Sequence, residues 1–397
     1  MSTDSSCSIR RLTEDDLDAL YRIRQIAFQD NVSWRNTEVQ KVHEASLPYK
    51  WGRFDDGELV SSASWYPFEM YLHGEATTVG GLASVVSAAA SRRRGHVRAL
   101  LAHGLETLRD DGVAWCLEYP FDTRYYRRFG WETVSNGFFF ELPVERFARF
   151  DSPPAIERVE LEGESLEQIG DIYAKWAANY NFTMARDEGV RDDWTRILEG
   201  PPWLENSPRF VFAMKRAYVV IKLERDGDSE HLTVLDYAFS TPAGRLDIFG
   251  FMNHFAGQVD TVRLQLPADD PLVMEWTNFI VAHPHPLHAR VVDVASALSG
   301  LKADEGLAFN VAVRDDFCAW NAGVFRVSVD GGVTHAEAVD APAELSVDVR
   351  ALAQMLSGSV TASAAMRTGL AHGGAHVAQA LCRLAGRGCY MPLSDYF

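Results

Sequence analysis

The chain has 397 residues, which is long enough for two or three domains that each bury a core of their own. Its formal net charge of −17 argues against nucleic acid and anionic membranes as partners, because both carry negative charge themselves. No apolar run approaches the roughly 20 residues that cross a bilayer, and no signal peptide is visible, so we expect a cytoplasmic protein.

The first third of the chain predicts alternating helices and strands. Apolar residues at helical spacing predict a largely helical segment over residues 8–44. Two β-branched runs, residues 58–71 and 76–87, predict strands joined by a turn at His73-Gly74. A basic loop and a helix follow them. The remaining predicted elements are a strand at 113–119, a short helix at 124–129 and a last strand at 131–142.

The basic loop is the most informative segment of the chain. It reads Ser91-Arg92-Arg93-Arg94-Gly95-His96-Val97-Arg98 and leads from the second strand into the helix. Unpaired N–H groups at a helix start, the positive end of the helix dipole and flanking arginines together favour a pyrophosphate. Neither the three-glycine dinucleotide fingerprint nor the Gly-Lys-Ser/Thr of a P-loop is present. The loop therefore predicts a phosphate-bearing cofactor, with a solvated arginine cluster as the alternative.

The rest of the chain predicts two further mixed units, separated from their neighbours by a linker at 151–155 and a boundary at 281–286. In the middle unit we expect helices near 166–180, 191–198 and 271–280, and strands near 209–223, 231–240 and 259–266. In the last unit we expect a strand running into a helix at 291–298, strands at 307–313, 323–329 and 343–349, and helices at 350–358 and 376–385. No basic loop opens the last helix of the middle unit, which predicts no cofactor site there. The five cysteines include no Cys-x-x-Cys pair, which predicts reduced thiols and no metal site.

Two motifs connect these elements to a known family. Arg92-x-x-Gly95 resembles motif A of the GNAT acetyltransferases, although Val97 stands where that motif has Gly or Ala. The segment Tyr126-x-Arg128-Phe129-Gly130-Trp131, the last unit with its segment 314–323, and an aromatic C-terminal residue look like the enhanced intracellular survival (Eis) acetyltransferases. This resemblance spans essentially the whole chain.

The resemblance implies an α+β architecture. Two tandem GNAT folds, each a mixed sheet with helices on both faces, are followed by a sterol-carrier-protein-2-like α/β domain. The implied domains are residues 1–150 (catalytic GNAT), 155–284 (second, non-catalytic GNAT-like) and 286–397 (sterol-carrier-like, supplying the chain end). Family members form rings, so we expect a homo-oligomer, with a hexamer favoured.

The resemblance also implies the chemistry. Acetyl-CoA is the co-substrate, and an amine attacks its thioester carbonyl directly while both are bound. The amine must lose a proton and the departing thiolate must gain one. By motif position Tyr126 is the general acid, with Tyr125 as the alternative, and the α-carboxylate of Phe397 is the general base. Aromatic and apolar neighbours such as Tyr390 favour an anchored chain end over a frayed one.

Cofactor and substrate residues follow from the same resemblance. The cofactor set comprises Val85, Val86 and Ser87 along the pantetheine arm, Arg92, Arg93, Arg94, Gly95, His96, Val97 and Arg98 around the pyrophosphate, and Phe121 beside the acetyl channel. The substrate set comprises Asp30, Trp34, Trp65 and Asp395. Carboxylates and aromatic faces suit a cationic amine, so the expected partner is a small polycationic molecule of the aminoglycoside or polyamine type.

Two other functions stay open at this point. The sterol-carrier-like domain could bind a lipid or another hydrophobic ligand, which a wide apolar cavity within residues 288–397 would favour. Alternatively, the same acetyl transfer could act on protein lysines, which a more open substrate cleft would favour.

Overall fold

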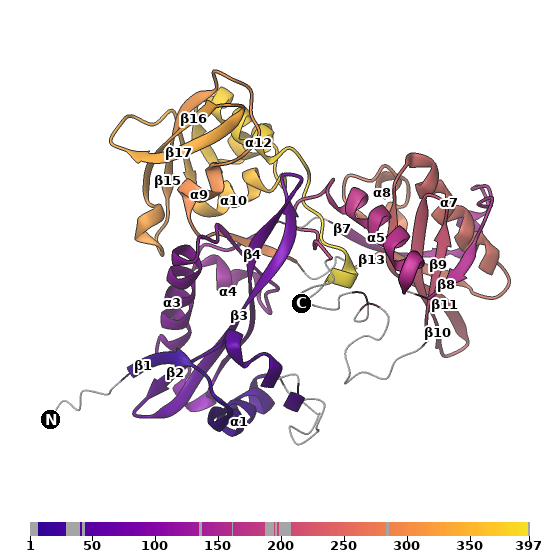
Figure 1. Cartoon of the computed structure of the whole chain (residues 1–397), viewed down its shortest axis with the longest axis horizontal. Coiled ribbons are helices and arrows are strands. Elements are labelled where there is room, and N and C mark those ends of the chain that lie inside the picture. Colours follow the sequence, from indigo (N-terminus) through magenta and orange to yellow (C-terminus); the bar gives the residue numbers. More distant parts are fainter. Residues whose placement is uncertain are drawn as a thin grey trace.

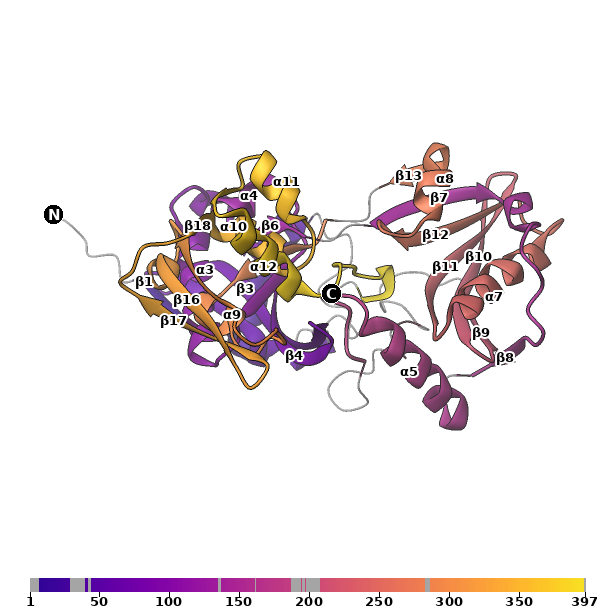
Figure 2. The same cartoon turned by 90° about the horizontal axis from the view of Figure 1, so that it is seen from above.

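The computed structural model describes residues 7–28, 40–41, 44–134, 137–160, 162–186, 194, 197, 208–282 and 286–395. These residues form three lobes, each built on its own sheet (Figure 1). The third lobe lies against the first, and the second lobe stands to one side of both (Figures 1 and 2). The predicted α+β class with three successive units is thereby confirmed.

The first lobe is a seven-stranded sheet with helices on both faces. Its strands lie in the order β1 (Cys7–Arg11), β2 (Lys50–Asp55), β3 (Glu58–Leu72), β4 (Glu75–Ser87), β5 (Trp115–Glu118), β14 (His288–Val291) and β6 (Glu132–Thr133). Its helices are α1 (Leu17–Phe28), α3 (His96–Asp110) and α4 (Thr123–Arg127). The predicted hairpin of β3 and β4 is confirmed. The predicted helix over 8–44 is wrong at its start, because residues 7–11 pair with β2 as an edge strand.

The second lobe repeats this plan. Its strands lie in the order β13 (Ile280–Ala282), β7 (Gly137–Pro143), β12 (Thr261–Pro267), β11 (Ser229–Phe239), β10 (Ala217–Asp226), β9 (Arg209–Met214) and β8 (Glu157–Val159). Its helices are α5 (Gly163–Ala177), α7 (Pro242–Met252) and α8 (Leu272–Glu275). The predicted strand at 209–223 is a hairpin of β9 and β10. Helix α7 was missed because it is buried over most of its circumference and has no amphipathic period.

The third lobe is a five-stranded sheet with its helices packed together. Its strands lie in the order β17 (Val333–Val339), β16 (Gly323–Asp330), β15 (Ala308–Arg314), β18 (Leu345–Asp348) and β19 (Ala371–Gly373). Its helices are α9 (Val294–Leu298), α10 (Val349–Leu356), α11 (Ala362–Arg367) and α12 (Ala375–Ala385). After α12 the chain leaves this lobe and runs to a short 3-10 turn at Leu393–Asp395, between the first and second lobes (Figure 1).

The lobes exchange strands across the predicted domain boundaries, which corrects them. β7 pairs with β12, so the predicted single strand at 131–142 is two strands, β6 and β7, in different sheets. β14 enters the first sheet between β5 and β6, although it follows the second lobe in sequence. Phe140 on β7 is fully buried in the second lobe against Trp276, and this apolar contact explains where the strand goes. The catalytic unit therefore ends near Val134 and is completed by residues 288–291.

The first and third lobes share one hydrophobic core. Met70 and Leu117 of the first sheet lie in the same buried cluster as Leu352 of α10 and Leu381 of α12. Since burial of apolar surface is the main force that stabilises folded proteins, these two lobes are expected to unfold together. The second lobe has its own core, around Phe140, Trp276 and the aromatic face of α7.

Asn181 ties all three lobes together. Its Nδ2 donates to the carbonyls of Ser357, Ala385 and Arg387 at 3.0–3.2 Å, and its Oδ1 accepts from the N–H of His73 at 2.7 Å. Its own N–H donates to the carbonyl of Gly388. The side chain is fully buried, so its amide supplies buried partners to several backbone groups at once, although the carbonyl of Ala385 also accepts from the N–H of Arg387.

Replacing Asn181 with Ala is therefore expected to lower the free energy of unfolding by roughly 2 kcal/mol or more, because several buried polar groups lose their partner together. Urea unfolding followed by fluorescence measures this. Asn179→Ala, which removes an amide that bonds only within its own helix end, is the matched control. Equal stability of the two variants would contradict the assignment of Asn181 as the junction.

Candidate active site

β4 and β5 part at the edge of the sheet where the predicted cofactor loop begins. Their parallel pairing covers only Gly80–Leu82 opposite Cys116–Glu118. β4 continues to Ser87, whereas β5 ends at Glu118. A register shift between β3 and β4 coincides with a left-handed Ser84, whose φ is 53°. Residues 85–87, the predicted pantetheine contacts, lie on the stretch of β4 beyond its last β5 partner, where a ligand arm could pair as an added strand.

The basic loop has the predicted strand–loop–helix setting. It leaves β4, passes through Arg92–Arg94 and enters α3 at Gly95. Arg93 and Gly95 are both left-handed, with φ of 65° and 83°. Turns of this kind direct successive backbone N–H groups into one concavity, which suits an anion. Arg92, Arg93 and Arg94 are exposed, so their guanidinium groups are available to a phosphate.

The next three predicted contacts have different surroundings. His96 is buried and its Nδ1 accepts a hydrogen bond from Nε of Arg53 at 3.0 Å. Burial and the Arg53 charge lower the pKa of His96. Val97, which departs from the motif, is partly buried and packs against the core under α3. The Arg98 guanidinium stacks over the Phe317 ring at 4.8 Å. The buried His96 side chain is thus not displayed to a cofactor, and a contact between Val97 and the cofactor stays a prediction.

Tyr126 lies on α4, the short helix that follows β5. Asp122 caps the helix by accepting from the N–H of Arg124 at 2.8 Å, and Gly130 ends it in a left-handed conformation. Arg290 lies so close that a Cβ on Gly130 would sit 2.6 Å from its guanidinium carbon, so only glycine fits there. Tyr126 is 4% exposed, and burial, together with the charges of Glu118 and Tyr125, raises its pKa well above 10. Its phenol is protonated at neutral pH, as a general acid requires.

Phe121, which is exposed, and Tyr125, which is half-buried, form an aromatic row beside Tyr126. The Phe121 ring lies 5.2 Å from Tyr125 and 6.0 Å from Tyr126, and 77% of Phe121 is exposed. The row continues through Phe129 to Phe317 of the third lobe, and Arg128 stacks on Tyr125. Phe121 is thus a surface residue at the side of α4, and its contact with a cofactor stays a prediction.

A buried acid–imidazole pair beside Tyr126 escaped the sequence analysis. Glu118 ends β5, His288 lies opposite it on β14, and Oε1 of Glu118 is 2.8 Å from Nδ1 of His288. Both are at most 1% exposed. Burial raises the pKa of Glu118 to about 9, and burial with the Arg127 charge lowers the pKa of His288 to about 4. At neutral pH the pair is therefore a neutral acid beside a neutral imidazole. A glutamate at the end of the apolar run Trp-Cys-Leu is a signal in the sequence that Glu118 is buried. No such signal marks its partner His288, which lies 170 positions away.

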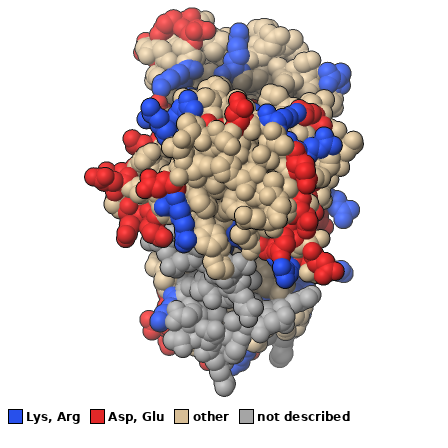
Figure 3. Space-filling view, turned by 90° about the vertical axis from the view of Figure 1, so that its right-hand side faces the viewer, with Lys and Arg blue, Asp and Glu red and all other residues tan. Residues whose placement is uncertain are grey.

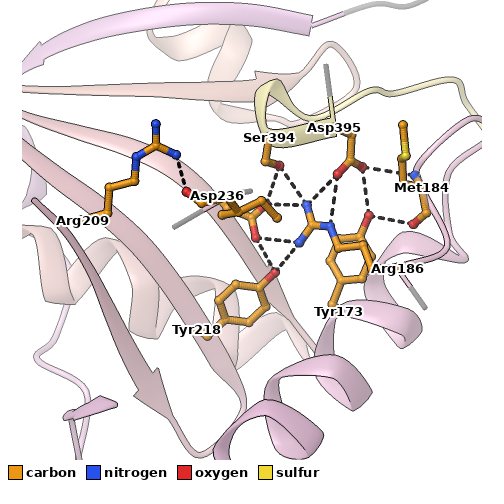
Figure 4. Close-up of polar contacts among 9 residues, drawn as sticks. Tyr173, Met184, Arg186, Arg209, Tyr218, Asp236, Ser394 and Asp395 are labelled. Carbon is orange, nitrogen blue, oxygen red and sulfur yellow. Dashed lines mark hydrogen bonds and ion pairs between the residues drawn. The ribbon is translucent and has the colours of Figure 1, made fainter. Parts of the chain in front are cut away.

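A second buried polar cluster holds the end of the chain in the second lobe (Figure 4). Arg186 pairs with Asp236 of β11 and with Asp395, at 2.8 Å and 2.7 Å. This corrects the prediction that Asp395 binds the amine: its carboxylate is 1% exposed and is taken up by Arg186, Tyr173 and the N–H of Met184.

The other predicted substrate residues divide into two groups. Trp65 is 7% exposed and its ring packs on Gly104 of α3, where a Cβ would lie 2.1 Å from it. It belongs to the core, so its assignment to substrate binding is corrected as well. Asp30, Trp34 and the proposed base Phe397 lie outside the described residues.

The described part of the chain contains no group of three or more His, Cys, Asp or Glu side chains that could hold a metal ion. Among the same residues, no helix is long and apolar enough to cross a membrane. Lysine, arginine, aspartate and glutamate side chains are interspersed around a broad area with few charges on the face shown in Figure 3. The negative net charge is thus not gathered into a single acidic patch on that face.

Comparison with known protein families finds a match for a segment near each end of the chain. Residues 8–134 match the family of the acetyltransferase (GNAT) domain, and residues 294–392 match the sterol carrier protein domain. The chain therefore contains a GNAT acetyltransferase domain and a sterol carrier domain. An uncharacterized N-acetyltransferase of Streptomyces avermitilis is 24% identical over 344 residues, which cover 78% of this chain and 80% of that protein. Both predicted domain types are confirmed.

Solved structures confirm the arrangement of the whole acetyltransferase. A GCN5-related N-acetyltransferase of Anabaena variabilis superposes with a TM-score of 0.84 at 20% identity, covering 99% of this chain and 100% of that one. Eis1 of Mycobacterium abscessus superposes with a TM-score of 0.77 at 20% identity and the same coverage. The fold is therefore Eis-like from end to end.

Glu118→Gln tests the neutral state of the buried pair. Between about pH 4.5 and 9 the folded protein keeps a proton on Glu118 that the unfolded chain releases, so the contribution of this residue to stability is lost as the pH rises through that window. Glutamine is neutral at every pH. We expect the variant to gain stability relative to the parent protein from pH 5 to 9, at up to about 1.4 kcal/mol per pH unit.

Urea unfolding at each pH gives this difference directly. Glu58→Gln, at an exposed position at the start of β3, is the control and should leave the pH dependence unchanged. A difference between Glu118→Gln and the parent protein that is constant from pH 5 to 9 would show that Glu118 is ionised in the folded state.

Proposed function

We propose that the first lobe transfers the acetyl group of acetyl-CoA to an amino group of a small polycationic molecule of the aminoglycoside or polyamine type. The main observation in support of this proposal is the order and direction of the strands in the first sheet. β4 and β5 are parallel neighbours, β4 leads into the arginine loop, and β5 leads into α4 with Tyr126. The arginine loop proposed to bind phosphate and the helix of the proposed acid Tyr126 therefore lie at the same edge of one sheet, on either side of the point where the two strands part, which supports the proposal.

The residues present fit acetyl-CoA, which GNAT acetyltransferases use as the acetyl donor. Arg92, Arg93 and Arg94 with the left-handed loop would hold its pyrophosphate, and the free stretch of β4 would hold its pantetheine arm. The bound thioester supplies the activated acyl group. Fixing it in this way lowers the entropic cost of the reaction, since an amine need only approach a carbonyl that is already oriented.

Tyr126 and Phe397 have complementary roles in the proposal. Tyr126 donates its phenolic proton to the sulfur of the departing CoA thiolate, and its burial and raised pKa keep that phenol protonated at neutral pH until the carbon–sulfur bond breaks. The α-carboxylate of Phe397 accepts a proton from the substrate ammonium, which leaves the neutral amine that attacks the thioester carbonyl. The anchoring of Asp395, two residues before it, supports this role for the chain end.

The proposal includes three finer points. The enzyme acts in the cytoplasm, assembles as a homo-oligomer with a hexamer favoured, and selects amines through the first lobe. Lipid binding is less well supported, because apolar residues of the sterol carrier lobe such as Leu352 and Leu381 are fully buried in the core that this lobe shares with the first. Acetylation of protein lysines shares the chemistry and is an outcome of the test below.

The test is release of the CoA thiol from acetyl-CoA with a panel of aminoglycosides, polyamines and lysine peptides. Turnover with the small polycations, at higher kcat/KM than with lysine peptides, is expected. Turnover with lysine peptides alone would move the assignment to protein acetylation. Absence of turnover with every amine, despite acetyl-CoA binding by calorimetry, would contradict the proposal.

Tyr126→Phe is expected to lower kcat by about 100-fold or more, because it removes the acid and keeps the ring. Calorimetry should show acetyl-CoA binding with an unchanged Kd. Tyr125→Phe, one position away in the same aromatic row, is the control and should retain activity. The opposite pattern, with Tyr125→Phe inactive and Tyr126→Phe active, would transfer the role of acid to Tyr125.

A further inference from the structure

The second lobe carries a buried polar cluster with Arg186 at its centre (Figure 4). The two terminal nitrogens of Arg186 donate to the two oxygens of Asp236 at 2.8 and 2.9 Å. Nε and one terminal nitrogen donate to Oδ1 of Asp395 at 3.1 and 2.7 Å. The same terminal nitrogen reaches Oγ of Ser394 at 2.8 Å. One guanidinium thus joins a strand of the sheet to the last turn of the chain.

Neutral groups complete the cluster. Tyr218 of β10 donates to Oδ2 of Asp236 at 2.6 Å, and Oγ of Ser394 donates to Oδ1 of Asp236 at 2.7 Å. On the tail side, the N–H of Met184 donates to Oδ2 of Asp395 at 3.1 Å, and the Tyr173 hydroxyl lies 2.9 Å from the same oxygen. The Tyr173 ring also stacks under the guanidinium at 3.7 Å. Both carboxylates are bonded through both of their oxygens.

Charge and burial make this cluster costly unless every member is in place. The side chains of Arg186, Asp236 and Asp395 are at most 1% exposed, and one cation faces two carboxylates. Burial alone would raise the pKa of Asp236, but Arg186 holds it below its ordinary value, with help from Tyr218 and Ser394. A buried ion pair is weak evidence for added stability, and its best-attested use is to fix one register among several. Here the register that it fixes is that of the tail.

The chain leading to the cluster is held in the same way. Tyr390 is 1% exposed and packs against Trp176 of α5 and against Tyr180. Nε2 of Gln265 on β12 donates to the carbonyl of Met391 at 3.1 Å. The segment 390–395 therefore lies on the α5 side of the second sheet, bound at its start through Tyr390 and at its end through Asp395.

The second lobe lacks the features that mark a cofactor site in the first. The helix α7, which follows β11 as α3 follows β4, is capped by Thr241, whose hydroxyl accepts from the N–H of Gly244 at 3.2 Å. The segment before this helix contains no arginine or lysine. Arg245 of its first turn pairs with Asp270 instead. The lobe keeps the sheet of an acetyltransferase and uses it to hold the tail.

We propose that the second lobe is a receptor for the C-terminal segment, in which Arg186, Asp236 and Tyr218 fix Ser394 and Asp395 and so position the chain end that follows for catalysis in the first lobe. This inference rests on the proposed function for its catalytic consequence. These are positioning residues, since they act through the tail and not on the substrate. In this proposal the second lobe takes part in each turnover by holding the C-terminal segment in position.

Asp395→Asn and the milder Ser394→Ala test the proposal. Asp395→Asn keeps the shape and removes the charge that Arg186 binds, whereas Ser394→Ala removes one hydroxyl that joins Arg186 to Asp236. Hydrogen–deuterium exchange of the peptide covering residues 386–397 reports on the anchoring itself. We expect faster exchange there and a lower kcat, about 100-fold for Asp395→Asn, because displacement of a catalytic group by 1 Å costs about that factor. The KM for acetyl-CoA should not change.

Glu230→Gln is the matched control, because it removes one carboxylate charge from an ion pair with Arg225 on the surface of the same lobe. It should leave both exchange and kcat unchanged. Unaltered exchange of residues 386–397 in both tail variants would overturn the receptor. Faster exchange with an unchanged kcat would overturn the positioning role and leave acetyl transfer intact. If the parent protein turns over no amine, the proposed function fails, and the exchange data still decide whether the receptor exists.

Discussion

The structure depends on the pairing of β14 with β5. β5 is a four-residue strand whose other neighbour, β4, accompanies it for only three residues before the two part to form the candidate cofactor site. Without His288–Val291 along its free edge, β5 would expose a row of backbone N–H and C=O groups and lose its position. The sheet of the first lobe is therefore incomplete without β14, which follows the second lobe in sequence. The three lobes are thus not independent domains arranged one after another along the chain.

Arg290 extends this dependence into the site. It enters on β14, is fully buried, and pairs with Asp315 of the third lobe. Its guanidinium lies against Gly130, where the helix that carries Tyr126 ends. His288, two residues earlier, faces Glu118 at the end of β5. β14 thus supplies two residues near Tyr126: Arg290 contacts the chain where α4 ends, and His288 pairs with Glu118.

The C-terminal segment connects the third lobe back to the second. After the third lobe the chain passes the Asn181 junction, places Tyr390 among the aromatic residues of the second lobe and brings Asp395 to Arg186. Each lobe therefore contributes to the proposed reaction. In that proposal the first lobe would hold acetyl-CoA and carries Tyr126, β14, just before the third lobe, completes the first sheet, and the second lobe holds the tail.

Local patterns carried the predictions that succeeded. The arginine loop, the hairpin of β3 and β4 and the helix ended by Gly130 depend on residues close in sequence, and the structure has all three. Long-range pairing was not predictable in the same way. Nothing in the sequence of β7 or β14 says which sheet each joins, and Asp395 looked available to an amine because its partner Arg186 lies 209 positions away. The buried pair of Glu118 with His288 shows the same limit: Glu118 ends an apolar strand and could be noticed, but the sequence does not indicate that His288 is its partner.

The most direct test of the central claim changes one functional group at the end of the chain. Ligation at the native Cys389 joins residues 1–388 to a synthetic peptide of residues 389–397 that ends in either a carboxylate or a carboxamide. The carboxamide keeps every side chain and removes only the proposed base. We predict that it releases CoA at least about 100-fold more slowly with its best amine, with an unchanged Kd for acetyl-CoA. A carboxamide protein as active as its carboxylate counterpart would contradict the account.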